Sequence, residues 1–343
     1  MEKKILLILV TLGFFLTGSV VFADQDPFDF SEPPCKSWTP ACIGGPLSND
    51  SHLLTVRWMG GANIELTYKG QVILLSAYFN RGPRAHSIGF TAEQVNRADA
   101  IFLGHGHFDH MSDAAQVALQ TGATVYAPKF AYEKLLTQGV HPNQLQYVHS
   151  GDVFHFNGFT VEAFHILHSG VPPAVQNPPA VQAAFSNLVA SMYGNPTPEE
   201  KAAEDAIKAK GASDPAIRTE GVVAYLLTFG KDFRFVFYDS ANATLTDEAK
   251  AIMARVGGRT DVTTLAYQGG PAEYAIPYDM PEIKLFNPRF FFPNHHDMGP
   301  GAYLDMTFEP LAEAIMKELP DTTPFSLLYR QPACFNVKKE GKR

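Results

Sequence analysis

Four side chains of metal-binding type fall within six consecutive positions of this sequence. His105, His107, Asp109 and His110 lie in the segment GHGHFDHM, which begins at Gly104. Imidazole and carboxylate groups are ligands of divalent ions, and two of them spaced by two positions on an extended loop can converge on one ion. Because Asp109 and His110 are adjacent, we expect them to turn toward a second ion close to the first. The segment therefore predicts a two-metal site.

The chemistry expected of such a site is hydrolysis. A divalent ion lowers the pKa of a bound water from about 15.7 toward about 7, so a metal-bound hydroxide is available at neutral pH to attack a carbon or phosphorus atom. The second ion polarises the substrate oxygen or steadies the leaving group, and a nearby carboxylate, Asp109 or Asp239, takes or returns a proton. No serine or cysteine nucleophile is then required.

An apolar strand at residues 100–103 leads directly into the metal-binding segment, and a helix at residues 114–120 follows it. Further strands are predicted at residues 53–59, 64–68, 72–75, 124–127, 153–156, 159–167, 222–229, 233–238 and 262–266, with another helix at 129–138. After residue 266 the pattern indicates mainly helices and loops. Blocks of strands that are each followed by helices favour a layered α/β fold, with sheets inside and helices outside.

Residues 169–220 interrupt this alternation and predict a helical insertion. Apolar residues recur there at helical spacing, and a second helix begins at Thr197, with Pro198 next and Glu200 completing a capping box. The apolar face consists of Val181, Phe185, Leu188, Val189 and Met192. This face either packs on the core or belongs to a lid over the metal-binding segment.

Residues 1–23 are typical of a signal peptide, with Lys3 and Lys4 before an apolar stretch and a small-residue cleavage pattern that ends at Ala23. The alternative is a retained anchor, because the stretch is near the lower length limit for spanning a bilayer. Cleavage predicts an exported protein, periplasmic or secreted, without stable membrane insertion. Residues 24–52 are then an N-terminal extension, and residues 53–343 form the folded domain.

Three cysteines remain after the signal segment: Cys35, Cys42 and Cys334. Cys35 and Cys42 would close a short loop in a proline-rich stretch, whereas a bond from Cys334 to either of them would tie the two ends of the chain together. The sequence does not choose among the three pairings. None of the three lies beside a histidine or aspartate ligand, so we assign them no metal.

The overall composition is that of a globular protein with a substantial core, since 45% of the residues are hydrophobic and 18% are charged. The 27 lysines and arginines are outnumbered by 35 acidic residues, for a net charge of -8. Without a surplus of positive charge to neutralise phosphates, a general nucleic-acid partner is disfavoured. A small molecule is the expected substrate, and the sequence does not indicate the oligomeric state.

The metal-binding segment resembles the signature of the metallo-β-lactamase superfamily, in which His-x-His-x-Asp-His is followed by a distant histidine, an aspartate and a final histidine. Here His168 lies in LHS, Asp239 in YDS and His295 in PNH, and each follows an apolar strand. The order agrees over residues 53–300. The resemblance implies a four-layer αββα sandwich over residues 53–343, with the helical insertion at about residues 169–220.

The resemblance also implies a set of ligands for two divalent ions, with zinc expected and manganese or iron as alternatives. His165 and His296 remain alternatives to their neighbours His168 and His295. The His-Ser step at His168 and the Pro-x-His step at His295 resemble the branch that contains ascorbate-phosphate lactonase-like and other small metal-dependent hydrolases. The first ion would be held by His105, His107 and His168, the second by Asp109, His110 and His295, with Asp239 bridging the two.

Three other positions bear on this resemblance. Asp113 matches the same branch, but Ser76 stands where such hydrolases usually carry an aspartate near the metals, so its charge is missing here. Tyr267, which follows a strand, is a candidate donor to a developing oxyanion. The His-x-Glu-x-Asp variant of the di-iron electron-transfer relatives is absent, which disfavours redox chemistry.

The predicted function is that of an exported hydrolase, an esterase or lactonase that acts on a small apolar substrate. The apolar preference comes from phenylalanines near the site loops, which alternatively fill the core: Phe79, Phe108, Phe286, Phe290, Phe291 and Phe292. One alternative is a phosphodiesterase of phospholipid-cleaving type, which would need a basic clamp, for which the candidates are Arg57, Arg81, Arg84 and Arg289. The other is a non-catalytic metal-binding protein.

Overall fold

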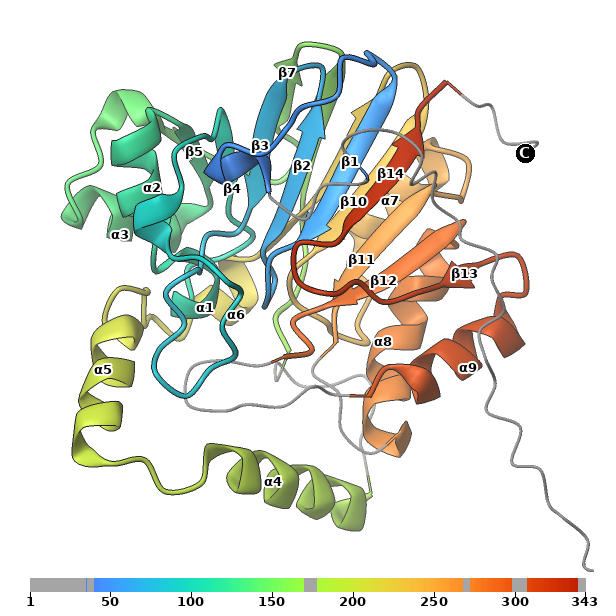
Figure 1. Cartoon of the computed structure of the whole chain (residues 1–343). Helices are drawn as coiled ribbons and strands as arrows, with labels where there is room; N and C mark the ends of the chain where they lie inside the picture. Colours follow the sequence, from blue (N-terminus) through green and yellow to red (C-terminus); the bar gives the residue numbers. More distant parts are fainter. Residues whose placement is uncertain (1–34, 36–39, 170–177, 268–271, 298–306, 339–343) are drawn as a thin grey trace, which may run out of the picture.

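Two seven-stranded sheets form the centre of the molecule in the computed structural model, which describes residues 35, 40–169, 178–267, 272–297 and 307–338 (Figure 1). The first sheet has the order β14 (Pro332–Asn336), β1 (Leu53–Trp58), β2 (Ile64–Tyr68), β3 (Gln71–Leu75), β4 (Ala100–Phe102), β5 (Thr124–Ala127) and β6 (Leu145–Tyr147). The second has the order β13 (Thr323–Pro324), β12 (Phe290–Asn294), β11 (Val262–Ala266), β10 (Phe233–Tyr238), β9 (Val223–Phe229), β8 (Phe159–His165) and β7 (Val153–Phe156).

The two sheets repeat one pattern of strand directions. In the first sheet β14, β1, β2 and β3 pair antiparallel, and β3 to β6 pair parallel. In the second sheet β7 to β10 pair antiparallel, and β10 to β13 pair parallel. Parallel strands place their carboxyl ends at one edge of a sheet, which is where open α/β sheets carry their ligand sites.

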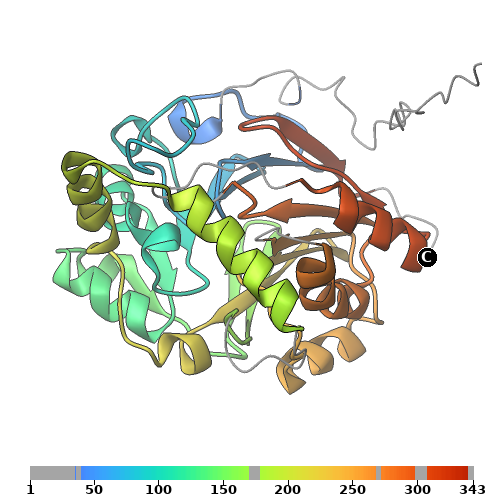
Figure 2. The ribbon, with the colours of Figure 1, turned by 90° about the horizontal axis from the view of Figure 1, so that it is seen from below.

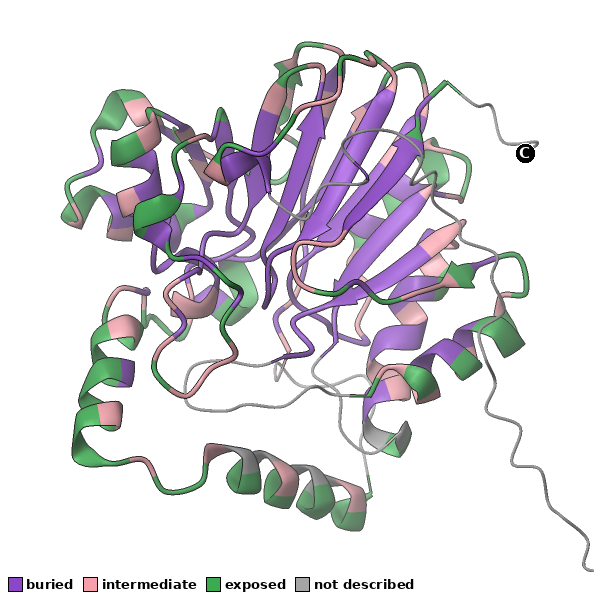
Figure 3. Ribbon diagram, viewed as in Figure 1, coloured by how far each residue is buried: buried purple, intermediate pink, exposed green. Residues whose placement is uncertain are grey.

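Helices cover the outer face of each sheet and complete four layers. The apolar core between the sheets is formed by buried residues of nearly every strand, including Phe102, Phe235 and Phe292. The outer face of the first sheet packs on α1 (Phe108–Met111), α2 (Ala114–Thr121) and α3 (Lys129–Thr137), and that of the second on α7 (Asp247–Arg255), α8 (Ala272–Phe286) and α9 (Glu309–Glu318). Figure 3 shows the strands buried between half-exposed helices. The predicted αββα sandwich is therefore confirmed.

Two expectations need correction. The C-terminal region contributes strand β14, which the sequence pattern assigned to helices and loops, because a five-residue strand whose partner lies at the other end of the chain leaves little local signal. The phenylalanines before His295 do not line a site: Phe286 and Phe291 fill the outer core, and Phe292 fills the core between the sheets. Most of these rings therefore do not support the prediction of an apolar substrate.

The insertion consists of α4 (Pro179–Tyr193), α5 (Pro198–Lys208) and α6 (Ile217–Glu220). The capping box between Thr197 and Glu200 is present at the start of α5. Leu188 packs partly against the outer core of the second sheet, whereas the side chains of Phe185, Val189 and Met192 lie outside the described part. Seen from below, α4 crosses the end of the molecule (Figure 2).

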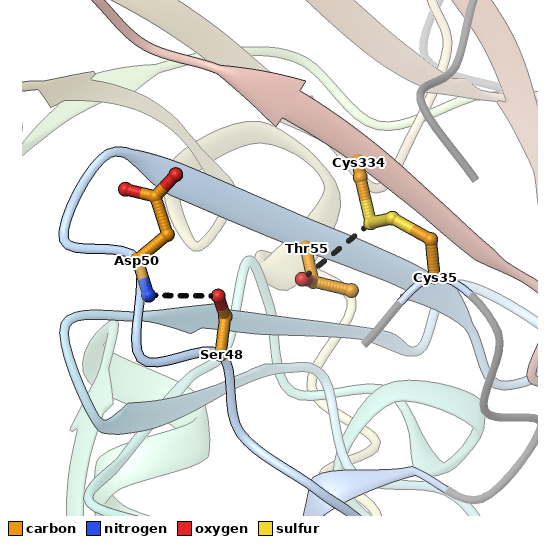
Figure 4. The surroundings of a disulfide bond; sticks show 5 residues. All are labelled: Cys35, Ser48, Asp50, Thr55 and Cys334. Carbon is orange, nitrogen blue, oxygen red and sulfur yellow. Dashed lines mark hydrogen bonds between the residues drawn. A yellow bond between two sulfur atoms is a disulfide. The ribbon is translucent and has the colours of Figure 1, made fainter. Parts of the chain in front are cut away.

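A disulfide joins Cys35 to Cys334 of β14 and so selects one of the three pairings (Figure 4). The two Cα atoms are 6.1 Å apart, and Cys42 is a free, buried cysteine. The short 3-10 turn η2 (Ala41–Ile43) is held to β2 by Glu65, which accepts hydrogen bonds from the backbone N–H groups of Ala41 and Cys42. Two further turns are η3 (Ala92–Gln94) and η4 (Pro142–Gln144).

The signal segment, residues 1–23, lies outside the described residues. Among the helices that the structure does describe, none is both long enough and apolar enough to cross a membrane.

Candidate metal centre

All of the implied ligands lie at or just beyond the carboxyl ends of strands. His105 and His107 follow β4, with His107 preceding α1, which carries Asp109 and His110. His168, Asp239 and His295 come from the second sheet, after β8, β10 and β12. The two sheets thus contribute ligands from opposite sides of one site. Three overlapping groups of ligand atoms result, and within each group the atoms lie within 4.8 Å of one another.

The first group consists of His105, His107 and His168. Nε2 of His105 lies 3.1 Å from Nδ1 of His107. Burial, together with the charges of neighbouring histidines, lowers the pKa of His107 to about 3 and that of His168 to about 2. Burial also lowers the pKa of His105. All three imidazoles are therefore neutral at pH 7, which is the form that binds a metal.

The second group consists of Asp109, His110 and His295. Oδ2 of Asp109 is 3.0 Å from Nε2 of His295 and 3.9 Å from Nε2 of His110. Burial raises the pKa of Asp109, but His110 and His295 outweigh it and hold the pKa well below its usual range. Asp109 is consequently an ionised carboxylate at neutral pH.

Asp239 lies between these two groups, in a third one with His105 and His110. Its Oδ2 is 3.3 Å from Nδ1 of His105 and 3.2 Å from Nδ1 of His110. Both carboxylate oxygens are buried, and neither accepts a hydrogen bond of good geometry from the described residues. A buried carboxylate without hydrogen bonds is costly, and cations placed between its neighbours would remove that cost. The donor set therefore fits divalent ions.

Gly104 makes room for this arrangement. A Cβ atom at Gly104 would collide with the carboxylate of Asp239, so any other residue would displace the central acid. Gly106 is confined less tightly, because a Cβ atom there would lie 3.1 Å from the backbone nitrogen of Ala131 and 3.2 Å from Cβ of Ala212. Close packing is therefore the reason for glycine at position 104, since neither glycine of the segment adopts a positive φ angle.

The two alternative histidines point elsewhere. Nε2 of His165 lies 2.9 Å from the carbonyl oxygen of Thr219, and His296 stacks on Trp58 with ring centroids 4.2 Å apart. Neither belongs to one of the three groups among the described residues. The structure therefore brings His168 and His295, rather than their neighbours, to the other ligands.

Tyr267 and Ser76 differ in whether they contact a predicted ligand. The hydroxyl of Tyr267 donates to the carbonyl oxygen of Thr307 at 3.0 Å, so its proton is already engaged by the backbone. Ser76 directly follows β3 and is buried, and its Oγ lies 3.4 Å from Nδ1 of His110. Ser76 thus lies beside a predicted metal ligand, at the position where hydrolases of the resembling branch carry an aspartate.

The loops that carry the ligands are held by residues that the sequence motif does not contain. Nδ2 of Asn242 donates to the carbonyl oxygen of His168 at 2.8 Å, and its N–H donates to Oε1 of Glu282 at 3.0 Å. Burial raises the pKa of Glu282 well above its usual range. Sequence reasoning missed both residues, because Glu282 reaches this loop only through the packing of α8.

A second support holds the loop after His295. The N–H of His295 donates to the carbonyl oxygen of Gly61 at 2.7 Å, and the N–H of Gly61 donates to Oδ1 of Asp297 at 2.8 Å. Asp297 also pairs with Arg81 at 2.5 Å and accepts from the hydroxyl of Tyr329. On the side of the first sheet, Oδ2 of Asp113 accepts hydrogen bonds from the backbone N–H groups of Phe79 and Asn80.

The four arginines considered for a phosphate clamp are all engaged by carboxylates. Their partners, with the shortest distances, are Glu65 for Arg57 (2.8 Å), Asp297 for Arg81 (2.5 Å), Glu204 for Arg84 (2.8 Å) and Asp261 for Arg289 (3.1 Å). A fifth arginine, which the sequence does not single out, lies directly beside a predicted ligand. Nη1 of Arg218 is 3.2 Å from Nδ1 of His168.

Comparisons with known proteins agree with this geometry. The family model of the beta-lactamase superfamily domain matches residues 72–189. A UPF0173 metal-dependent hydrolase of Brucella ovis is 33% identical over 132 residues, which cover 36% of this chain and 54% of that protein. The chain thus spans about half the length of the curated relatives that it matches.

Solved structures show the same fold at low sequence identity. Igni18, a metallo hydrolase from the archaeon Ignicoccus hospitalis, superimposes with a TM-score of 0.56 at 15% identity, covering 83% of this chain and 100% of that one. An isothiocyanate hydrolase from Delia radicum gut bacteria gives 0.52 at 14% identity, covering 82% and 99%. The fold is therefore of the metallo-β-lactamase type. The chain is therefore similar to the beta-lactamase superfamily domain over residues 72–189 and to the UPF0173 metal-dependent hydrolases over 36% of its length, and it shares the fold of the solved metallo hydrolase.

Proposed function

We propose that this protein is a metal-dependent hydrolase that cleaves an ester or a lactone. The observation that carries the proposal is the convergence of seven histidine and aspartate side chains in three overlapping groups around the buried carboxylate of Asp239. The name of the Brucella relatives, metal-dependent hydrolase, supports it. We further propose two divalent ions, with zinc first and manganese or iron as alternatives.

Divalent ions in such a donor set supply Lewis acidity and an activated water near neutral pH. The neutral imidazoles of His105, His107 and His168 keep their lone pairs available. The side chain of Asp239 is fully buried, whereas that of Asp109 is 20% exposed. We therefore assign a holding role to Asp239, and to Asp109 the role of accepting and returning a proton at a carboxylate oxygen.

The choice of bond rests on what surrounds the ligands. A phosphodiesterase would need a clamp of several basic residues for the phosphate. The four arginines considered for that purpose pair with carboxylates, and Arg218 beside the ligands is a single residue rather than a clamp. Tyr267 is not retained as an oxyanion donor, since its hydroxyl donates to Thr307. The fold alone does not identify which bond is cleaved, because an isothiocyanate hydrolase has the same fold.

The test is a chelator-controlled hydrolysis panel at neutral pH with an acyl lactone, an aryl ester, an aryl phosphodiester and a β-lactam. We expect turnover of the lactone or ester that chelation abolishes and zinc or manganese restores. Asp109→Asn should lower kcat by about 100-fold or more, as expected for loss of a general base. Asp152→Asn is the matched control, because Asp152 pairs with the exposed His149 on the surface.

Two results would contradict the proposal. Preferred cleavage of the phosphodiester would replace the ester or lactone with the phosphodiesterase alternative. Metals bound in full amount, with no turnover of any of the four substrates, would favour the non-catalytic metal-binding protein.

We also propose that the mature protein is exported. The disulfide between Cys35 and Cys334 supports this, because such bonds persist in oxidising compartments. Mass spectrometry of the protein purified from its own cells should find a chain that begins at residue 24, in the periplasmic or secreted fraction. An intact N-terminus in the cytoplasmic fraction would contradict export.

A further inference from the structure

Arg218 of α6 is attached to the loop that carries a ligand of the first group. Its Nη1 donates to the carbonyl oxygen of Ser169 at 2.6 Å and lies 3.2 Å from Nδ1 of His168. Its own carbonyl oxygen accepts from the N–H of His168 at 3.0 Å. Arg218 also contributes to the low pKa of His107, after burial and the neighbouring ligands. The guanidinium therefore lies beside the first group of ligands.

The positive charge of the Arg218 guanidinium is available to bind an anion. Arg218 is exposed, and among the described residues no carboxylate lies within ion-pair distance of it. A guanidinium has five N–H donors and stays charged at all accessible pH values, so the bond to Ser169 uses a small part of its capacity. Arg84, on the loop after β3, shows the contrast, because it is neutralised by Glu204.

We infer that Arg218 binds an oxyanion of the substrate, a carboxylate or a phosphate group, next to the bond that is cleaved at the metal centre. This inference rests on the proposed hydrolase function and narrows its substrate class. Planar, forked N–H donors match the two oxygens of a carboxylate or phosphate, and such charge-assisted pairs are stronger than neutral hydrogen bonds. The substrate is accordingly an anionic ester or lactone rather than a wholly apolar one.

A purely structural role of Arg218 predicts a different pattern of activity losses. If Arg218 served only to hold the carbonyl of Ser169, its loss would disturb the loop of His168 and slow the hydrolysis of every substrate alike. An anion-binding role affects only substrates that carry the charge. The experiment therefore compares substrates that differ in charge and share one leaving group.

The substrates are mono-4-nitrophenyl succinate, its neutral methyl ester and 4-nitrophenyl 3-phosphonopropanoate, an ester whose separate anionic group is a phosphonate. Arg218→Ala should lower kcat/KM for an anionic substrate by about 10- to 100-fold, the range for hydrogen bonds to a charged group, and change the neutral ester by less than about 3-fold. Arg218→Lys should retain part of the preference. The matched control is Lys208→Ala, which removes an equal charge from an exposed position on α5. Whether kcat/KM falls more for the succinate ester or for the phosphonate ester identifies the preferred oxyanion.

Equal losses for the neutral and anionic esters, or no loss for either, would overturn the inference. If the wild-type protein cleaves none of these substrates, anion binding is read by calorimetry instead; the proposed function fails only if the acyl lactone and the aryl ester are not cleaved either. Succinate and inorganic phosphate are then titrated into zinc-loaded wild-type and Arg218→Ala proteins of equal zinc content. At least one should bind about 10-fold more weakly to the variant, and equal affinities would overturn the inference.

Discussion

Ser76 and His295 both adopt positive φ angles, of 66° and 60°, immediately after strands of the two sheets. Such angles are uncommon for residues other than glycine, and they concentrate at functional sites where the surroundings enforce them. At His295 the turn brings the ring to Asp109, and at Ser76 it brings the hydroxyl to His110. A positive φ angle thus positions the predicted ligand His295 after a strand of the second sheet, and it positions Ser76, which contacts the predicted ligand His110, after a strand of the first sheet.

Ser76→Asp tests whether the missing charge matters. Aspartate tolerates a positive φ angle better than most residues, and a carboxylate beside His110 would add negative charge to the site. We expect zinc affinity, measured by chelator competition, to rise by about 10-fold, in the range found for groups that contact metal ligands. Ser76→Ala, which adds no charge, is the control. An unchanged affinity in Ser76→Asp would show that this position does not tune the metals.

At this scale the sequence was informative only where the chemistry is local. His105, His107, Asp109 and His110 lie in one short segment, so their types and spacing alone predict a metal site. The contacts of Arg218 could not be predicted, because they depend on how α6 meets the loop after β8. The distant ligands required a family resemblance for the same reason.

The helical insertion contacts the rest of the molecule at two places. Nη1 of Arg84 donates to the carbonyl oxygen of Tyr193 at the end of α4, at 2.6 Å, and its Nε pairs with Glu204 of α5 at 2.8 Å. Beyond α5, a Cβ at Gly211 would collide with the backbone of Phe108, and the N–H of the next residue donates to the carbonyl oxygen of Gly106. The predicted insertion therefore contacts the metal-binding segment directly.

Arg84→Ala should loosen α4 and α5 while leaving the sheets intact. The carboxylate of Glu204 is 4% exposed, and removing its partner leaves a buried charge, at a cost of about 3 kcal/mol. Hydrogen exchange should become faster at residues 198–208 and stay unchanged in the strands. The control is Lys201→Ala, which breaks an exposed pair with Asp205 on the same helix and should leave the exchange rates nearly unchanged. Unchanged exchange in Arg84→Ala would contradict a fastening role.

Elements with strong local patterns were predictable, and elements defined by distant partners were not. The strands β1, β2 and β10 lie where alternation and apolar runs place them, and the capping box at Thr197 starts α5 as expected. β14 and the two-residue strand β13 exist through their pairing with β1 and β12. Pairing of this kind leaves no periodicity in a single short segment.

On the scale of the whole molecule, the two sheets repeat one strand pattern and share one core, and a disulfide joins the N-terminal extension to β14 at the edge of the first sheet. Cys35 bonds to Cys334 of β14 over a sequence separation of 299 residues. In its described part the N-terminal extension is therefore attached to the strand that completes this sheet.

Loss of this bond should destabilise the fold by about 2–4 kcal/mol, the usual contribution of a native disulfide. Cys35→Ser, Cys334→Ser and the double variant should show the same free energy of unfolding under oxidising conditions, since each removes the same bond. Denaturant titration measures it, and treatment of the wild type with a reductant should reproduce the loss. Additive losses in the double variant would indicate that the two cysteines act separately.

The central claim is that the two sheets assemble a centre for two metal ions, and metal content tests it most directly. The protein is loaded with zinc, freed of excess by gel filtration and analysed by mass spectrometry for metal per chain. We predict two ions in the wild type and in the surface control His149→Ala, one in His168→Ala and one in His295→Ala. One ion in the wild type, or two in both ligand variants, would contradict the account.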